Sequence, residues 1–173
     1  MDDKKNAVLI VDDNKSNIRL LISTLESHGF ETITARSGSM GIRRAEFSGP
    51  DLILLDVMMP GMDGFETCRH LKANNKTKDI PVIFMTALIN VENKLRGFQV
   101  GGVDYITKPF EEAEVMARVK THLALRNTQK QLQEEIAERR QTEIELQLAK
   151  ESAEAASRTN SAPRSTPFSD FPG

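Results

Sequence analysis

The stretch "DLILLDVMMPGMDGFE", residues 51–66, decides the fold because one short run joins three signals. Residues 52–55 are apolar without alternation, which is typical of a strand covered on both faces of a parallel sheet. The run ends on the carboxylate of Asp56, and a Pro-Gly turn at 60–61 and a helix N-cap at Asp63 follow it. Because burying an unpaired carboxylate is costly, we expect Asp56 to lie at the mouth of the sheet, where a ligand or metal ion can reach it.

Similar apolar runs recur along the first part of the chain. The other predicted strands are "AVLIV" at 7–11, "TITA" at 32–35, "PVIFM" at 81–85 and "VDYI" at 103–106. "TITA" is the weakest of them and is expected further out in the sheet. Helical patterns separate the strands, and they run from Asn14 to Gly29, from Ser37 with Met40 and Phe47 among its apolar positions, from Asp63, over 91–100, and after Pro109.

This alternation of strand and helix defines the fold class. Five βα units in about 120 residues predict an open α/β sheet of parallel strands joined by right-handed crossovers. A closed eight-stranded α/β barrel is excluded, because the chain is too short to build one.

Composition and charge restrict the kinds of partner and the cellular location that we expect for this protein. The chain has 173 residues and a formal net charge of -2, which gives no support to a nucleic-acid partner. Its one cysteine, Cys68, excludes an intrachain disulfide and fits the reducing cytoplasm. We see no signal peptide at the N-terminus and no apolar run as long as a membrane span. A soluble cytoplasmic protein without a membrane partner is therefore expected.

Five chemically useful side chains stand at the ends of predicted strands. Asp12 and Asp13 follow the first strand, Asp56 the third, Thr86 the fourth and Lys108 the fifth. Ligands of open α/β sheets bind at this carboxyl edge, so these groups should converge there. Three neighbouring carboxylates need a counter-ion, and Mg²⁺ prefers such oxygen ligands. A cation, an ammonium group and a hydroxyl together suit a phosphoryl group, with one carboxylate free to act as the nucleophile.

Four motifs carry a resemblance to a known family. "VLIVDDN", "LILLDVMMPGMDGFE", "VIFMTA" and "DYITKPF" occur in this order, each at a strand end. Together they resemble the receiver domain of bacterial two-component response regulators, over roughly residues 5–125. The resemblance implies a five-stranded parallel sheet of the flavodoxin-like, doubly wound kind. It also implies a phosphorylation-dependent signalling switch that receives its phosphoryl group from a sensor histidine kinase, a phosphotransfer protein or a small phosphodonor.

The resemblance assigns a role to each acidic residue. It makes Asp56 the phosphoacceptor. It makes Asp12 and Asp13 part of a Mg²⁺ site, in which Asp13, Asp56 and the backbone carbonyl of Met58 are direct ligands. The alternatives fit less well, because the sequence has neither the G-x-G-x-x-G of a dinucleotide-binding fold nor a nucleotide-hydrolysing phosphate loop. A receiver-like domain that no longer accepts phosphate is the remaining alternative for this cluster.

The other motif residues belong to the phosphoryl site and its readout. By the same resemblance, Lys108 pairs with the phosphoryl oxygens and Thr86 bonds to them after transfer. Tyr105 matches the aromatic switch residue, which turns inward when that hydroxyl moves. The bond between Lys108 and Pro109 is expected to be cis, as is common in the family.

The composition changes from about Glu111. Neither proline nor glycine occurs again before Pro163, and we predict one helix that runs to about Ser157. The apolar positions on one stripe of this helix are Leu125, Leu132, Ile136, Ile144, Leu148 and Ala155. Their spacing is coiled-coil-like with a stutter near Arg140, and it favours a parallel homodimer through residues from about 118 to 155.

The predicted organisation is therefore a receiver domain at 1–125, a coiled-coil extension at 126–157 and a disordered tail at 158–173. The extension resembles the signalling helices that precede histidine kinase or diguanylate cyclase modules. We find no separate catalytic domain and no helix-turn-helix, so an enzyme is not expected. Two alternatives stay open for the output. Beside a switch that acts through the switch face and the C-terminal helix, these are an adaptor whose working part is the coiled coil, and a truncated N-terminal part of a receiver-linked histidine kinase or diguanylate cyclase.

Overall fold

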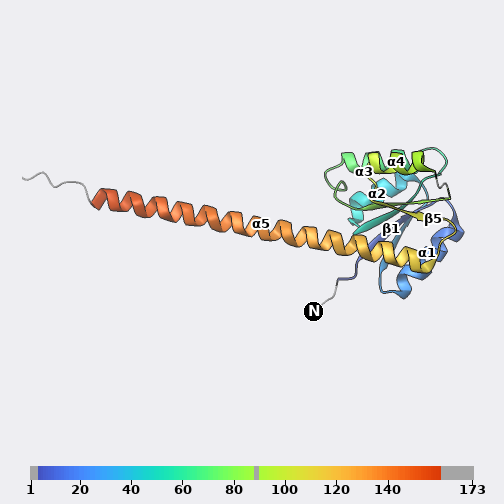
Figure 1. Ribbon diagram of the computed structural model, residues 1–173, viewed down its shortest axis with the longest axis horizontal. Helices are drawn as coiled ribbons and strands as arrows, with labels where there is room; N and C mark the ends of the chain where they lie inside the picture. Colours follow the sequence, from blue (N-terminus) through green and yellow to red (C-terminus); the bar gives the residue numbers. More distant parts are fainter. Residues whose placement is uncertain (1–3, 88–89, 161–173) are drawn as a thin grey trace, which may run out of the picture. The chain divides into compact units, whose positions relative to one another are not determined.

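The computed structural model describes residues 4–87 and 90–160 (Figure 1). The chain divides into two compact units, residues 1–127 and 128–173. The elements are β1 Ala7–Val11, α1 Lys15–Ser27, β2 Glu31–Ala35, α2 Gly38–Ser48, β3 Leu52–Asp56, α3 Gly64–Ala73, β4 Val82–Thr86, α4 Val91–Gln99, β5 Asp104–Thr107 and α5 Glu112–Asn160. The predicted alternation of strands and helices is confirmed.

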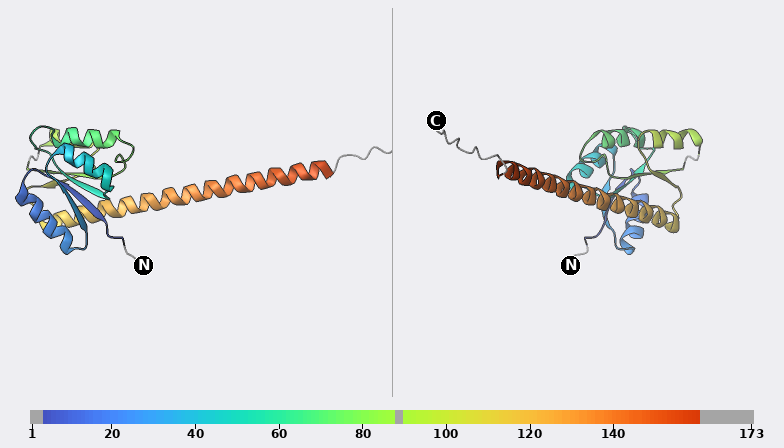
Figure 2. Two further views of the ribbon diagram at one scale, coloured as in Figure 1. Left: turned by 180° about the vertical axis from the view of Figure 1, so that it is seen from behind. Right: turned by 60° about the vertical axis from the view of Figure 1, so that its left-hand side comes forward.

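The strands form one parallel sheet in the order β2-β1-β3-β4-β5. The predicted doubly wound α/β fold is thus confirmed, and the weak strand "TITA" lies at an edge, as expected. Figures 1 and 2 show α1 on one side of the sheet and α3 and α4 on the other. Each side carries its own apolar cluster.

The apolar run of β3 is explained by these two clusters. Leu52 and Leu54 pack with residues of α1 and α5, whereas Ile53 and Leu55 pack with residues of α2 and α3. All four side chains have 0% exposure. Because both faces of the strand are covered, no position in it needs a polar side chain until Asp56.

The turn after β3 is held by close backbone packing. A Cβ atom on Gly64 would meet the backbone carbonyl oxygen of Asp56, and it would lie 2.8 Å from the Cα of Val57. Asp63 caps α3, as predicted, and its carboxylate accepts a hydrogen bond from the Glu66 N–H at 2.8 Å. The glycine therefore lets α3 begin against the end of β3, which fixes the direction in which Asp56 leaves the sheet.

One expectation about the helices needs correction and another is confirmed. Phe47 was predicted among the apolar positions of the second helix, but its side chain is 94% exposed. It lies in the last turn of α2, on the side away from the buried Ala45. The single long helix predicted to run to about Ser157 is confirmed, and α5 ends at Asn160.

The C-terminal unit begins within α5, at Thr128. The predicted disordered tail at 158–173 is helical at 158–160, and its remainder lies outside the described residues. The large apolar side chains of α5 after residue 124 are each about half exposed or more, and these are Leu125, Leu132, Ile136, Ile144, Leu146 and Leu148. Among residues 4–87 and 90–160, no helix combines the length and apolar character that a membrane span requires.

Candidate functional site

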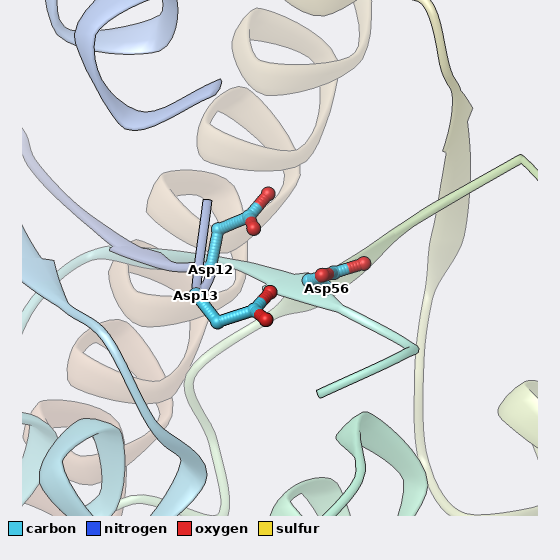
Figure 3. A group of neighbouring side chains, drawn as sticks. All are labelled: Asp12, Asp13 and Asp56. Carbon is cyan, nitrogen blue, oxygen red and sulfur yellow. The ribbon is translucent and has the colours of Figure 1, made fainter. Parts of the chain in front are cut away.

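Three carboxylates meet at the carboxyl edge of the sheet (Figure 3). One oxygen atom from each of Asp12, Asp13 and Asp56 lies within 4.8 Å of the others. Asp12 and Asp13 directly follow β1, and Asp56 is the last residue of β3, the neighbouring strand. Asp12 is 0% exposed and Asp56 is 4% exposed, so two of these acids are almost removed from water.

Lys108 connects two of the acids from the other side of the site. Its Nζ lies 2.9 Å from Asp56 Oδ1 and 3.3 Å from Asp12 Oδ2. Lys108 follows β5, and its backbone N–H is held by the carbonyl oxygen of Thr86 at 3.0 Å. The peptide bond to Pro109 is cis, as the resemblance implied.

A cavity of about 230 Å³ lies above these groups. It is lined by all of the predicted site residues except Tyr105, together with Asn14, Asn17 and Ala87. Thr86 is 5% exposed at its wall, whereas the Met58 side chain is 66% exposed at its rim. The structure therefore brings acids, ammonium group and hydroxyl to one opening that is wide enough for a small anion.

Burial controls the charge of Asp56. It raises the pKa of this carboxyl from 3.8 to about 6, with the Asp12 charge adding to the effect and the hydrogen bond from Lys108 opposing it. Burial also acts to lower the pKa of Lys108, but the hydrogen bond and charge of Asp56 outweigh it, so this pKa is raised. Asp56 is thus ionised at neutral pH and protonated in mild acid.

The site fits a hard divalent cation. Three carboxylates and one ammonium group leave a charge of -2 when all are ionised, and the three acids offer oxygens at close range. Within residues 4–87 and 90–160, no hydrogen bond or ion pair occupies the carboxylate of Asp13, which leaves its oxygens available to a metal ion. The Met58 backbone N–H donates to Asp56, and the role of its carbonyl as a ligand stays a prediction. Oxygen ligands of this kind and number suit Mg²⁺.

Tyr105 is the one predicted residue that the structure keeps outside the cavity. It is 8% exposed and lies beneath α4, where its hydroxyl donates a hydrogen bond to the Asn93 carbonyl oxygen at 2.6 Å. The rings of Phe84 and Phe98 pack against it at 5.5 and 5.6 Å between centroids. Its position connects β5 to the backbone of α4 rather than to the acids.

The sequence alone missed the side chain of Asn17. Its amide nitrogen lies 3.1 Å from Asp12 Oδ2. Asn14 was predicted as a helix cap, and its side chain does accept hydrogen bonds from the Ser16 and Asn17 N–H groups. Its own N–H also donates to Asp12 Oδ1 at 2.9 Å. The available signal was the spacing in "DDNKSN", because the third residue after a cap lies in the first helical turn, close to the strand end.

Comparison with known families gives a match that covers most of the N-terminal unit. The family model for the response regulator receiver domain matches residues 8–120. The response regulator PleD of Caulobacter vibrioides is 43% identical over 114 residues, which are 66% of this chain and 25% of that protein. The chain spans between a quarter and a half of the length of the curated relatives it matches.

Solved structures agree with this match. A putative response regulator from Chloroflexus aurantiacus is 36% identical with a TM-score of 0.67, and the alignment covers 70% of this chain and 99% of that one. The receiver domain of the sensor histidine kinase PA1611 from Pseudomonas aeruginosa is 28% identical with a TM-score of 0.65, covering 69% and 98%. That receiver holds a magnesium ion in its active site cleft.

Proposed function

The chain belongs to the response regulator receiver domain family, and on that premise we propose that the carboxylate of Asp56 accepts a phosphoryl group in the presence of Mg²⁺. The observation that carries the proposal is the convergence of three acids and one ammonium group on a single small cavity. The proposed donor is a cytoplasmic histidine kinase or phosphotransfer protein, or a small acyl phosphate. We assign residues 1–125 to this reaction and residues 126–157 to its output.

The proposed reaction is a single phosphoryl transfer. An oxygen of ionised Asp56 forms a bond to phosphorus while the bond from phosphorus to the donor breaks, and the electron pair of that bond leaves with the donor atom. A Mg²⁺ ion bound by Asp13, Asp56 and the Met58 carbonyl, with Asp12 beside it, would supply positive charge to the phosphoryl oxygens.

Lys108 is placed to serve the same transfer. Its Nζ contacts Asp56 Oδ1 at 2.9 Å. It therefore lies close to the position that an oxygen of the transferred phosphoryl group would occupy. An ammonium group that is already held in place by the acids stabilises charge there with little reorganisation. The proposal therefore gives Lys108 a role after the transfer as well as before it.

The proposed readout begins at Thr86. A hydroxyl that bonds to the phosphoryl group draws the end of β4 toward Asp56, and β4 pairs directly with β5 through Phe84 and Tyr105. Tyr105 in turn holds the backbone of α4. We propose that phosphorylation changes this contact and so remodels the surface made by α4, β5 and α5.

The test is the mass of the protein after incubation with acetyl phosphate and Mg²⁺. We expect the wild type to gain one phosphoryl group and the Asp56→Asn variant to gain none. Asp13→Asn should require much more Mg²⁺ for the same yield. An equal mass gain in Asp56→Asn would show that another residue is the acceptor.

We propose homodimerisation through α5 as the output, on the observation that its large apolar side chains are exposed. Val119 and Leu123 are buried against the sheet of their own unit, so the pairing surface starts at Leu125 rather than at residue 118. The alternatives are an adaptor whose coiled coil works without phosphorylation, and a part of a longer kinase or cyclase. The receiver of PA1611, which belongs to a sensor histidine kinase, supports the last of these.

A further inference from the structure

The carboxylate of Asp12 is held by three donors, two from the start of α1 and one from the residue after β5. Its Oδ1 accepts the Asn14 N–H at 2.9 Å. Its Oδ2 accepts both the Asn17 amide at 3.1 Å and the Lys108 ammonium at 3.3 Å. Asp12 is 0% exposed, so its carboxylate depends mainly on these protein donors.

Asn17 is held in place by its own helix. It lies in the first turn of α1, and its backbone N–H donates to the Asn14 side chain at 3.2 Å. Only the NH₂ group of an amide can donate to a carboxylate, so chemistry fixes which end of the side chain faces Asp12. Asn17 also lines the cavity above the acids.

The Lys108 ammonium group contacts both Asp12 and Asp56, and the Asn17 donor affects which of the two carboxylates it contacts more closely. Asp12 Oδ2 has two donors, while Asp56 Oδ1 receives the shorter contact from Lys108, at 2.9 Å. If the Asn17 donor were removed, Oδ2 would depend on Lys108 alone. The ammonium group would then be drawn toward Asp12, and the Asp12 carboxylate would turn from its present orientation.

We infer that Asn17 is a positioning residue of the cation site: its amide holds the Asp12 carboxylate beside Asp13 and Asp56 and thereby sets the affinity for Mg²⁺. This inference rests on the proposed function, since it takes Mg²⁺ as the cation. Hydrogen-bond partners of metal-binding carboxylates commonly change metal affinity by about 10- to 100-fold when they are lost. For Asn17 we expect the lower end of this range, because Asp12 lies beside the proposed Mg²⁺ rather than among its direct ligands, and because Lys108 and the Asn14 N–H remain.

The test is calorimetric titration of the full chain with MgCl₂ alone, without a phosphodonor. Asn17→Ala and Asn17→Leu both remove the donor, and the second keeps a branched side chain in the space of the amide. Both should raise the Kd for Mg²⁺ about tenfold. Ser16→Ala is the matched control, because Ser16 is an exposed neighbour in the same helical turn. Its Kd should equal that of the wild type.

Two further measurements separate positioning from a general effect on folding. Thermal unfolding in a chelator should give nearly the same Tm for wild type and both Asn17 variants. With acetyl phosphate, the Mg²⁺ concentration for half-maximal rate should rise about tenfold, while the rate at saturating Mg²⁺ changes little.

The inference is overturned if both Asn17 variants bind Mg²⁺ within twofold of the wild type, or if Ser16→Ala weakens binding equally. If the wild type itself binds no Mg²⁺, the proposed cofactor and this inference are both wrong. If the wild type binds Mg²⁺ but gains no phosphoryl group, only the proposed function fails, and the calorimetric comparison still decides the role of Asn17.

Discussion

The hydroxyl of Tyr105 lies 2.6 Å from the backbone carbonyl oxygen of Asn93, so the end of the sheet is tied to α4 by a side chain that is 8% exposed. This contact depends on Gly97, because a Cβ atom there would overlap the Tyr105 hydroxyl and lie 2.7 Å from its ring carbon Cζ. The inward position of Tyr105 therefore requires glycine at position 97.

Gly97→Ala should displace Tyr105 from beneath α4. Tyr105 is the single tyrosine of a chain without tryptophan, so its fluorescence reports on this side chain alone. We expect acrylamide to quench the fluorescence of Gly97→Ala more strongly than that of the wild type. Gln99→Ala, an exposed position of the same helix, is the control. Equal quenching of all three proteins would mean that the helix, rather than the tyrosine, moves aside.

The Thr86→Ala variant should accept the phosphoryl group, but phosphorylation should no longer change the structure around α4 and β5. The acids and Lys108 remain in this variant, whereas the hydroxyl proposed to bind the phosphoryl group is lost. Amide exchange across residues 90–110, measured with and without a beryllofluoride phosphoryl mimic, should change in the wild type and much less in the variant. The same change in both proteins would remove Thr86 from the readout.

Asp56 should titrate near neutral pH. In a chelator, the carboxyl ¹³C signal of Asp56 should give a pKa of about 6, well above 3.8, because burial disfavours the charged form. Added Mg²⁺ should lower this pKa, since a bound cation favours the carboxylate. Phosphorylation should slow as the pH falls through the pKa, because the protonated carboxyl is not a nucleophile. An unshifted pKa of 3.8 would contradict the burial described here.

Asp56→Asn should stabilise the fold at neutral pH. The folded-state pKa of Asp56, about 6, lies above the ordinary value of 3.8, so its protonation favours the folded state. The wild type therefore loses stability as the pH rises from about 4 through 6, and asparagine does not. We expect a gain of about 1–2 kcal/mol in the free energy of unfolding at about pH 7.5 in a chelator. The gain should vanish at about pH 4, and urea unfolding at both pH values measures it.

The exposed apolar side chains of α5 should pair between two copies of the chain. Leaving these side chains exposed to water costs a free energy of roughly 1.5–3 kcal/mol for each large side chain that is not buried. Light scattering of the full chain should give a dimer, while Leu132→Lys combined with Ile136→Lys should give a monomer. Gln133→Lys combined with Ala137→Lys, two exposed positions with the same spacing, is the control, because it adds the same charge beside the stripe. A wild-type monomer at tens of micromolar would favour a docking helix for another protein.

The sequence by itself determined the order of the elements and the set of acids. Short apolar runs without alternation, bounded by turn residues, are typical of strands that are covered on both faces, and β3 fulfils this with Leu52–Leu55 buried in two clusters. Strand ends in a parallel sheet share one edge, so the positions of Asp12, Asp13, Asp56 and Lys108 followed from their places in the chain. The exposure of Phe47 did not follow, because helical periodicity is blurred in the last turn of a short helix.

Only the tertiary structure decided the contacts between side chains from distant segments. Lys108 is divided between Asp12 and Asp56, which are 96 and 52 residues away in the chain, because β1, β3 and the end of β5 meet at one edge. The raised pKa of Asp56 likewise depends on how completely its neighbours exclude water. Such distances are set by the packing of whole elements to within an ångström, whereas a sequence pattern specifies only which elements meet.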